Sequence, residues 1–189
     1  FLELISSQTT LSYELALIKE FWIALATAHE VMCNETTNKQ GEYEYNGISS
    51  DEVELVKTAN EQGFSYVHSG HSSINAIKCI KIGNTLYEYE VLHVLKFSSE
   101  RRRMGIILRD KEGVIKLYIK GADCEIKKRL NKQSVLDPGV QLSLHNIDIL
   151  STYGYRTLSF AYKVITHDEY VAWNDSLNKS ENDTIRRDT

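Results

Sequence analysis

Residues 104–120 read MGIILRDKEGVIKLYIK, two apolar runs separated by a short polar segment that ends in glycine. Large aliphatic and β-branched side chains dominate both runs. The pattern predicts strands over 104–109 and 114–120, joined by a turn through Asp110 and Gly113. Strands joined by so short a turn pair antiparallel, so this stretch predicts part of an antiparallel sheet.

The chain before this hairpin has the same character. Residues 86–97 are predicted to be extended, with every second side chain from Tyr87 to Phe97 on one side. Gly83-Asn84 is a plausible two-residue hairpin turn before them. One face of the expected preceding strand is made of alternate residues, namely Ile74, Ala76, Lys78, Ile80 and Ile82.

Helical signals precede these strands. Residues 13–32 repeat apolar side chains at helical spacing and predict a largely buried helix. A polar loop over 33–48 follows, with a short strand expected around Tyr43 and Tyr45. Ser49 and Glu52 then have the spacing of a capping box that begins a helix, and Gly63 suits its end.

Helical signals return after the strands. Asp123 can cap a short helix, and Asp137-Pro138 begins a longer one that Gly154 ends. Residues 155–164 alternate like a strand, and Thr166 with Glu169 forms another capping box. We therefore expect an α+β fold, an antiparallel sheet flanked by helices.

Size and charge narrow the function classes. The 189 residues suit a single domain over 1–189, with a frayed polar tail at 181–189. The formal net charge of −4 argues against a nucleic-acid binder. The three scattered cysteines suit neither a disulfide framework nor a zinc site, and no run approaches the ~20 apolar residues that cross a bilayer. Because the chain opens in mid-pattern without Met, we expect a piece excised from a larger protein.

Four segments, taken in order, resemble the nucleotide-binding domain of the P-type ATPases. Residues 49–57, SSDEVELVK, are similar to the S-P-D-E-x-A-L-V stretch of the type IV branch, the phospholipid flippases. Residues 95–104, LKFSSERRRM, are similar to L-x-F-x-S-x-R-K-R-M. Residues 120–123 read KGAD, and residues 154–158, GYRTL, are close to G-L-R-T-L. The likeness extends from about Phe21 to Trp173.

The chain departs from the family pattern at three positions within or beside these segments. Ser50 replaces the usual Pro, Gly105 stands where Ser is common, and Tyr155 replaces Leu. None of them removes a residue that the resemblance assigns to ATP.

The resemblance implies an ATP site without a catalytic residue or metal-ligand set in this chain. Phe97 is the expected platform for adenine, Lys120 lies at the mouth of the adenine pocket, and Arg156 reaches the phosphates. The complete implied set is Glu52, Phe97, Ser99, Arg102, Lys120, Gly121 and Arg156.

Each of these residues also has an ordinary structural explanation. Phe97 could be a core side chain of an alternating strand, and Lys120 a solvated lysine before a turn. Gly121 either permits close approach of a backbone or is turn chemistry. Glu52 either completes its capping box or accepts a hydrogen bond from adenine, and both roles compete for one carboxylate.

The sequence also lacks two motifs of phosphoryl transfer. It has neither D-K-T-G-T, whose Asp is phosphorylated in these pumps, nor a G-x-x-x-x-G-K-[ST] loop. The resemblance therefore implies a domain on the cytosolic side of a membrane protein that binds ATP without hydrolysing it alone. Mg²⁺ would be bound mainly outside this chain, and the expected partners are the phosphorylation, actuator and transmembrane domains and a transported phospholipid.

Two alternatives remain open beside the flippase hypothesis. One is the equivalent domain of a cation-transporting P-type ATPase. The other is a non-catalytic interaction domain that kept this fold and lost nucleotide binding.

Overall fold

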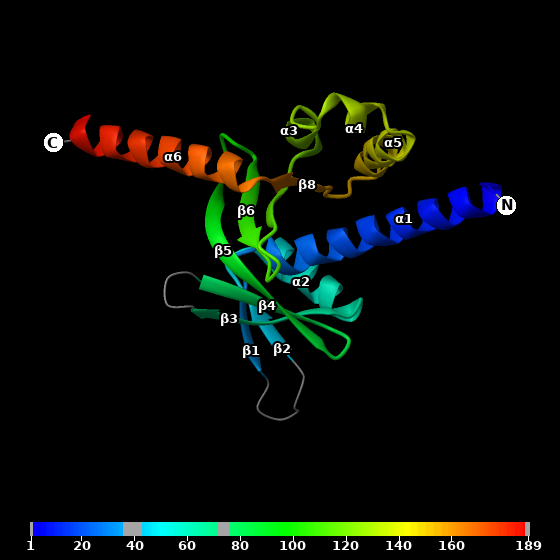
Figure 1. The fold of residues 1–189 in the computed structure, drawn as a ribbon, viewed down its shortest axis with the longest axis horizontal. Helices are drawn as coiled ribbons and strands as arrows, with labels where there is room; N and C mark the ends of the chain where they lie inside the picture. Colours follow the sequence, from blue (N-terminus) through cyan, green and yellow to red (C-terminus); the bar gives the residue numbers. More distant parts are fainter. Residues whose placement is uncertain (1, 36–42, 72–75, 188–189) are drawn as a thin grey trace.

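The computed structural model describes residues 2–35, 43–71 and 76–187, and these form helices and strands in an α+β arrangement (Figure 1). The elements in chain order are α1 Leu2–Thr27, β1 Met32–Glu35, β2 Tyr43–Asn46, α2 Ser50–Glu61, β3 Phe64–His71, β4 Ala76–Ile82, β5 Thr85–Ser98, β6 Arg103–Arg109, β7 Ile115–Gly121, α3 Asp123–Lys127, α4 Lys132–Leu136, α5 Pro138–Thr152, β8 Ser159–Ile165 and α6 His167–Arg187.

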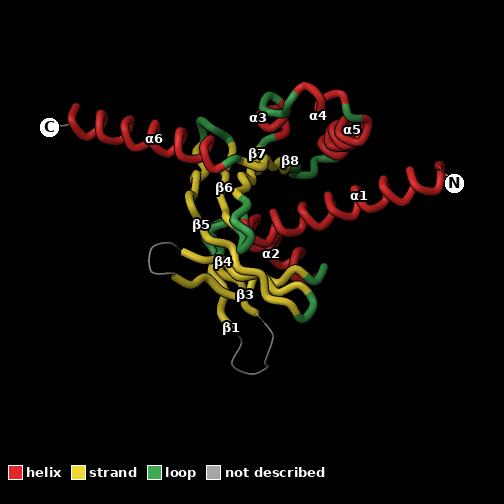
Figure 2. The backbone as a smooth tube through the Cα atoms, viewed as in Figure 1, coloured by secondary structure: helices red, strands yellow, loops and turns green. Residues whose placement is uncertain are grey.

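A six-stranded antiparallel sheet forms the centre of the molecule, with the strand order β3-β4-β5-β6-β7-β8 (Figure 2). The predicted hairpin is confirmed: β6 pairs with β7 and Met104 lies opposite Lys120. The predicted turns are also confirmed, since Gly83 and Gly113 adopt positive φ values of 58° and 83°. A second, two-stranded sheet joins β1 to β2.

The main core lies between this sheet and the last turns of α1. Ile23 and Ala26 of α1 are buried with Ile80, Ile106 and Tyr118, which come from three strands. Apolar side chains of α2, such as Val56 and Ala59, are buried too. Burial of these side chains positions the ends of α1 and the start of α2 over the sheet.

Contrary to the sequence prediction, the side chains of β5 do not alternate regularly from Tyr87 to Phe97. Its pairing with β6 shifts register between Val91 and His93 and again between Leu95 and Ser98. A β-bulge inserts an extra residue and re-aims the side chains that follow. Phe97 therefore lies in the second irregularity and does not continue the face that begins at Tyr87.

Several boundaries differ from the sequence prediction. The chain forms β3, which the sequence did not reveal, as well as the short helix α4. Helix α1 begins at Leu2, ahead of the predicted start, and ends at Thr27. Its residues 13–19 are exposed, so the predicted burial holds only for its last turns. Strand β8 begins only at Ser159. Ile74, expected at the start of a strand, lies outside the described residues. Helix α6 continues to Arg187, and the frayed tail over 181–189 stays a prediction.

Both capping boxes begin helices where the sequence predicted them. At α6 the box is complete: Glu169 N–H donates to Thr166 Oγ1 at 3.2 Å, and Thr166 N–H donates to Glu169 Oε2 at 2.9 Å. At α2 only half of it forms, since Glu52 N–H donates to Ser49 Oγ at 3.4 Å. This difference leaves the Glu52 carboxylate available for other contacts.

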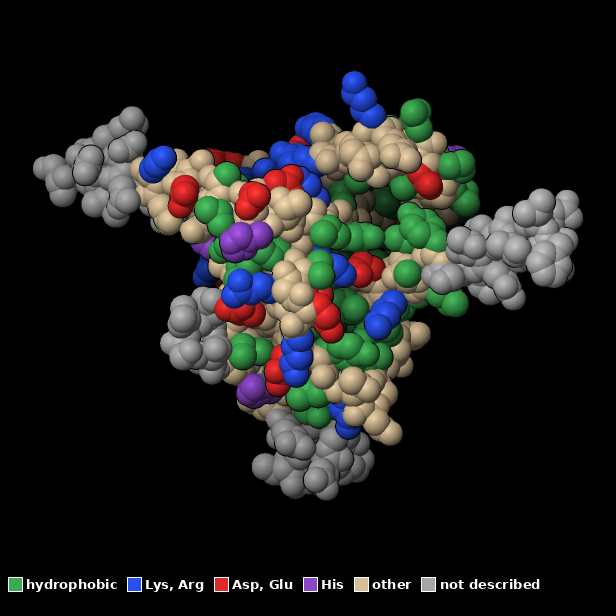
Figure 3. All heavy atoms as spheres, in the orientation of Figure 1, with side chains coloured by type: hydrophobic (Ala, Val, Ile, Leu, Met, Phe, Trp, Pro, Cys, Tyr) green, Lys and Arg blue, Asp and Glu red, His purple; other side chains and the backbone are tan. Residues whose placement is uncertain are grey.

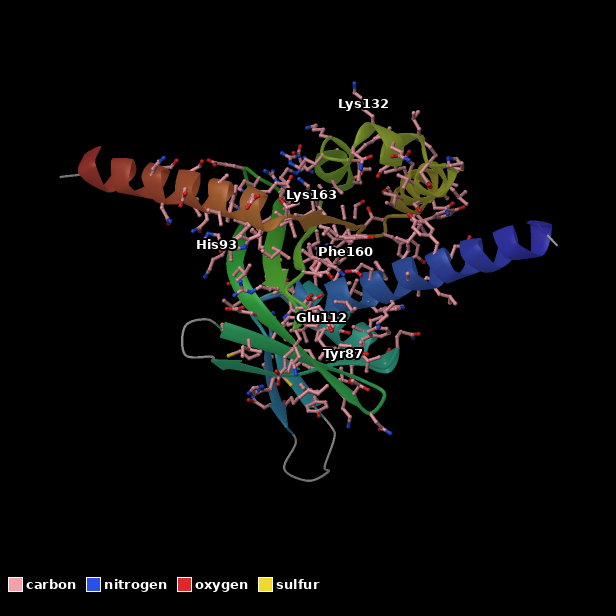
Figure 4. All side chains as sticks on the ribbon, in the orientation of Figure 1. Tyr87, His93, Glu112, Lys132, Phe160 and Lys163 are labelled. Carbon is pink, nitrogen blue, oxygen red and sulfur yellow. The ribbon has the colours of Figure 1, made fainter. Side chains whose placement is uncertain are left out.

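The two long helices, α1 and α6, extend away from the sheet in opposite directions, so the chain ends lie far apart (Figure 1). Helices α3, α4 and α5 arch over the side of the sheet that carries β8 (Figure 1). Trp173 of α6 packs edge-on against His93 of β5, with ring centroids 5.0 Å apart, and Figure 4 labels His93 near this helix. None of the described helices is long and apolar enough to cross a membrane.

Candidate functional site

The candidate site is centred on an ion pair between the end of β7 and the first turn of α2. Lys120 Nζ lies 2.8 Å from Glu52 Oε1, and the two side chains are only 7% and 20% exposed. Burial lowers the pKa of Lys120, and its hydrogen bond to Glu52 opposes this shift. A buried ammonium needs such a partner, because desolvation without one is costly.

The carboxylate of Glu52 turns toward the sheet and not back to its own helix start. Its second oxygen, Oε2, accepts a hydrogen bond from the Glu30 backbone N–H at 3.2 Å. In the part of the chain that the structure describes, the Ser49 backbone N–H does not donate a hydrogen bond to this carboxylate, as a complete capping box would require. The capping role is therefore left to Ser49, and Glu52 joins α2 to β7 and to the segment after α1.

Phe97 lies at the end of β5 with 62% of its surface exposed. Lys96, beside it, forms an ion pair with Glu30 at 3.2 Å. Because Glu30 N–H also contacts Glu52, the bulged end of β5 is tied to the same segment as the ion pair. An exposed aromatic ring held at a bulge is a surface on which a flat ligand can stack.

The turn between β5 and β6 brings Arg102 to the edge of this site. Arg102 N–H donates to Ser98 O at 2.8 Å, and Arg102 adopts a left-handed φ of 49°. This backbone region is uncommon for residues other than glycine and is enriched at functional sites. The side chains of Ser99 and Arg102 are exposed, and no contact with the ion pair is described for either.

Gly121 is required by the strand beside it. A β-carbon at this position would lie 2.5 Å from the Arg102 carbonyl oxygen and 2.8 Å from Arg103 Cα. Ala122 N–H donates to the same Arg102 oxygen at 3.1 Å. The backbone that approaches Gly121 closely is thus that of the turn between β5 and β6. Glycine at this position lets the turn lie against the end of β7.

Arg156 reaches the site through the start of α2. Its Nη2 lies 2.8 Å from Asp51 Oδ2, and Asp51 directly precedes Glu52. The Arg156 side chain is 85% exposed. An exposed ion pair contributes little, so Arg156 can exchange Asp51 for a phosphate oxygen at small cost.

The structure thus brings Glu52, Lys120, Gly121 and Arg156 together around the end of β7. Ser98 of β5, Arg103 of β6 and Gly121 of β7 are paired in one row across the sheet. Phe97 and Lys120 directly precede the two outer members of this row, so they lie two strands apart. Ser99 and Arg102 lie on the turn at the rim of this row. The ligand contacts of all seven residues stay predictions.

Sequence reasoning missed the buried lysine behind this site. Lys78 of β4 is 8% exposed, and its Nζ donates to the carbonyl oxygens of Thr27 at 2.9 Å and His29 at 2.5 Å. Burial lowers the pKa of Lys78 to about 7, with nearby Lys120 as the next cause. The one sequence signal was its place on the face that it shares with Ile80 and Ile82.

His29 lies beside Lys78 and is buried as a neutral imidazole. Its Nδ1 accepts from Val31 N–H at 3.1 Å, so Nε2 carries the proton and donates to Ala26 O at 2.9 Å. Burial holds the pKa of His29 well below its usual value, and the positive charge of Lys78 lowers it further. This histidine therefore orders the end of α1 without carrying a charge.

An apolar cavity of about 300 Å³ lies between α1, α3, α5 and the start of β8. Phe21, Leu144 and Phe160 are among its lining residues, and Figure 3 shows a hollow with hydrophobic side chains between the helical arch and α1. Phe160, labelled in Figure 4, is the strand partner of Lys120. The cavity thus adjoins the candidate site without containing its charged residues.

Comparison with known proteins agrees with this architecture. The family model described as P-type ATPase, cytoplasmic domain N, matches residues 22–188. The human phospholipid-transporting ATPase IC is 36% identical over 171 residues, which cover 90% of this chain and 13% of that protein. A fission-yeast (Schizosaccharomyces pombe) relative, phospholipid-transporting ATPase C887.12, is 32% identical over 174 residues, covering 91% of this chain and 13% of that protein.

A plant protein is similar to the chain to the same degree. The probable phospholipid-transporting ATPase 5 of Arabidopsis thaliana is 34% identical over 168 residues, which cover 87% of this chain and 13% of the plant protein. The chain thus spans only 13% of the length of each of these relatives. With the antiparallel sheet, its flanking helices and a family match over most of its residues, the chain belongs to the family of the cytoplasmic N domains of P-type ATPases.

Proposed function

We propose that this chain binds ATP at the end of β7, as the nucleotide-binding domain of a phospholipid-transporting P-type ATPase. The single observation that carries the proposal is the buried Lys120–Glu52 ion pair at the end of β7, in the same row of paired strand ends that carries the exposed Phe97 on β5. The names of the relatives support phospholipid as the substrate transported by the parent protein, and membership of the P-type ATPase family supports ATP as the ligand.

Adenine stacks on Phe97 in this proposal. Stacking of a base on an aromatic ring contributes on the order of 1–3 kcal/mol. The ring is already exposed, so no core has to open to receive the base. Glu52 and Lys120 offer an acceptor and a donor, which suit the polar edge of a purine next to its stacking face.

The phosphates extend toward the exposed cations around the site. Arg156 offers a fork of donors that suits phosphate oxygens, and Arg102 lies on the turn beside Gly121. Mg²⁺ would be held mainly by the phosphates and by groups outside this chain, since this ion commonly takes only one or two protein carboxylates beside phosphate oxygens and waters.

The terminal phosphate of ATP would be transferred to an Asp on a separate phosphorylation domain. The other partners of this chain would be the actuator and transmembrane domains of the same protein. Phosphoryl transfer depends mainly on positioning and charge neutralisation at the transferred group. The chain contributes the positioning of the adenine end. By itself it binds ATP on the cytosolic side and leaves it intact.

Calorimetric titration of ATP into the chain tests this function. We expect weak but saturable binding by the natural chain and at least about tenfold weaker binding by Lys120→Met, which removes the ammonium and keeps the stem. Lys57→Met, at an exposed lysine of α2, is the matched control and should bind as before.

Two results contradict the proposed function. One is the absence of ATP binding by the folded natural chain, which favours a non-catalytic interaction domain. The other is unchanged affinity in folded Lys120→Met. Phosphate release from ATP by the chain alone would contradict the assignment of transfer to a separate domain.

A further inference from the structure

The ammonium of Lys78 caps the end of α1 from inside the molecule. Helix α1 ends at Thr27, and the last carbonyls of a helix lack partners within it. Lys78 Nζ donates to two of the carbonyl oxygens at this end, those of Thr27 and His29. A cation is also favoured at this end of a helix by the helix dipole.

One peptide group connects this cap to the candidate site. The carbonyl of His29 accepts from Lys78, and the N–H of the same peptide group, which belongs to Glu30, donates to Glu52 Oε2. Glu52 Oε1 then pairs with Lys120. Hydrogen bonds in series polarise one another, so a donor on the carbonyl strengthens the bond made by the N–H.

We propose that Lys78 is a positioning residue of the ATP site, which holds Glu52 and thereby Lys120 in place through the His29–Glu30 peptide group. This inference rests on the proposed function. Lys78 is buried behind the site and acts on the ligand only through these groups.

The charges around Lys78 are consistent with this role. Lys120 of β7 repels its ammonium, and Glu52 of α2 and Glu30 attract it. The neutral His29 accepts from it at 3.3 Å, and the ring of Tyr66 of β3 lies 5.1 Å from Nζ. Tyr89 of β5 is its neighbour across the sheet. Lys78 and Lys120 are thus both attracted by the Glu52 carboxylate, so removal of Lys78 changes the charge balance around Glu52.

The test compares ATP affinity and the backbone amide NMR signal of Glu30 in matched variants. We expect Lys78→Met to weaken ATP binding about fivefold to tenfold. In the ligand-free protein it should shift the Glu30 amide signal in the same direction as Glu52→Gln does. Lys81→Met, at an exposed lysine of the same strand, should change neither.

A double variant separates positioning from a general loss of structure. If Lys78 acts through Glu52, Lys78→Met adds little to the loss of affinity in Glu52→Gln. Additive losses, or unchanged affinity with an unmoved Glu30 signal in Lys78→Met, overturn the inference. Absence of ATP binding by the natural chain instead contradicts the proposed function, so the two failures are distinguishable.

The natural chain provides a second measurement if Lys78→Met does not fold. The lowered pKa of Lys78, about 7, predicts that the Glu30 amide signal titrates with a midpoint near this pH. A Glu30 amide signal that stays unmoved through the pH range in which the Lys78 side-chain signal titrates overturns the inference.

Discussion

Glu52 Oε1 lies 2.8 Å from Lys120 Nζ, and this contact joins the first turn of α2 to the end of β7. The partners are far apart in the sequence, and both are largely shielded from water. Loss of either partner therefore destabilises the fold as well as the proposed site, because the other would remain as a buried, uncompensated charge.

Glu52→Gln should destabilise the domain by about 1–3 kcal/mol, since it leaves the Lys120 ammonium without an anion. Chemical denaturation of the ligand-free chain measures this loss. Glu54→Gln on the same helix removes only an exposed pair with Lys57, so we expect a loss of less than about 1 kcal/mol. Equal stability of the two variants would show that the Lys120–Glu52 pair does not stabilise the fold.

Gly121→Ala should destabilise the domain more than Gly154→Ala does. A β-carbon at position 121 collides with the Arg102 backbone, whereas one at position 154 meets nothing within 4 Å. Gly154 has a φ of 80°, so alanine there costs about 1 kcal/mol through its backbone alone. Thermal unfolding ranks the two variants, and the reverse order would refute the steric role of Gly121.

Phe97→Ala should weaken ATP binding by about fivefold to hundredfold and change the stability by less than about 1 kcal/mol. The exposed ring adds little to the core, and in the proposed site it stacks on the base. Tyr13→Ala is the matched control, because Tyr13 is equally exposed, at 62%, but lies on α1, 16 residues before His29. Affinity and thermal unfolding of both variants check this prediction, and an equal effect of both on affinity speaks against stacking.

The stability of the domain should rise by about 1–2 kcal/mol between about pH 7 and about pH 8.5. Burial lowers the pKa of folded Lys78 to about 7 from its ordinary 10.5, so in this window the unfolded chain binds a proton that the folded chain lacks. The folding penalty of Lys78 is complete below this window and is relieved as the pH rises. The lowered pKa of Lys120 acts in the same direction.

Urea denaturation at several pH values measures this dependence. Lys78→Met should flatten the rise, whereas Lys81→Met should leave it intact. The lowered pKa of His29 acts below this window, and the raised pKa of Cys79 acts above it. A natural chain that is no more stable at the higher pH would show that Lys78 is not desolvated.

The sequence predicted the features that depend on local pattern. The hairpin over 104–120, the helix after Asp137 and the starts of α2 and α6 need only alternation, turn glycines and capping residues, and all are present. Strand β3 escaped prediction because its sequence, FSYVHSGH, mixes polar and aromatic residues and its pairing shifts register between Tyr66 and His68.

The candidate site could be predicted only in part, because tertiary contacts decide it. No local pattern shows whether the Glu52 carboxylate turns to its cap or to Lys120. The exposure of Phe97 depends on a bulge that alternation cannot reveal. A lysine within a strand is ordinarily solvated, and Lys78 is buried only because the end of α1 supplies carbonyl oxygens.

Amide NMR of the chain during an ATP titration is the sharpest test of ATP binding at the end of β7. We expect the largest shifts at Phe97, Lys120, Gly121 and Arg156 and in the first turn of α2, with weak, saturable affinity. Shifts confined to the apolar cavity beneath α5, or no shifts at any ATP concentration, would contradict it.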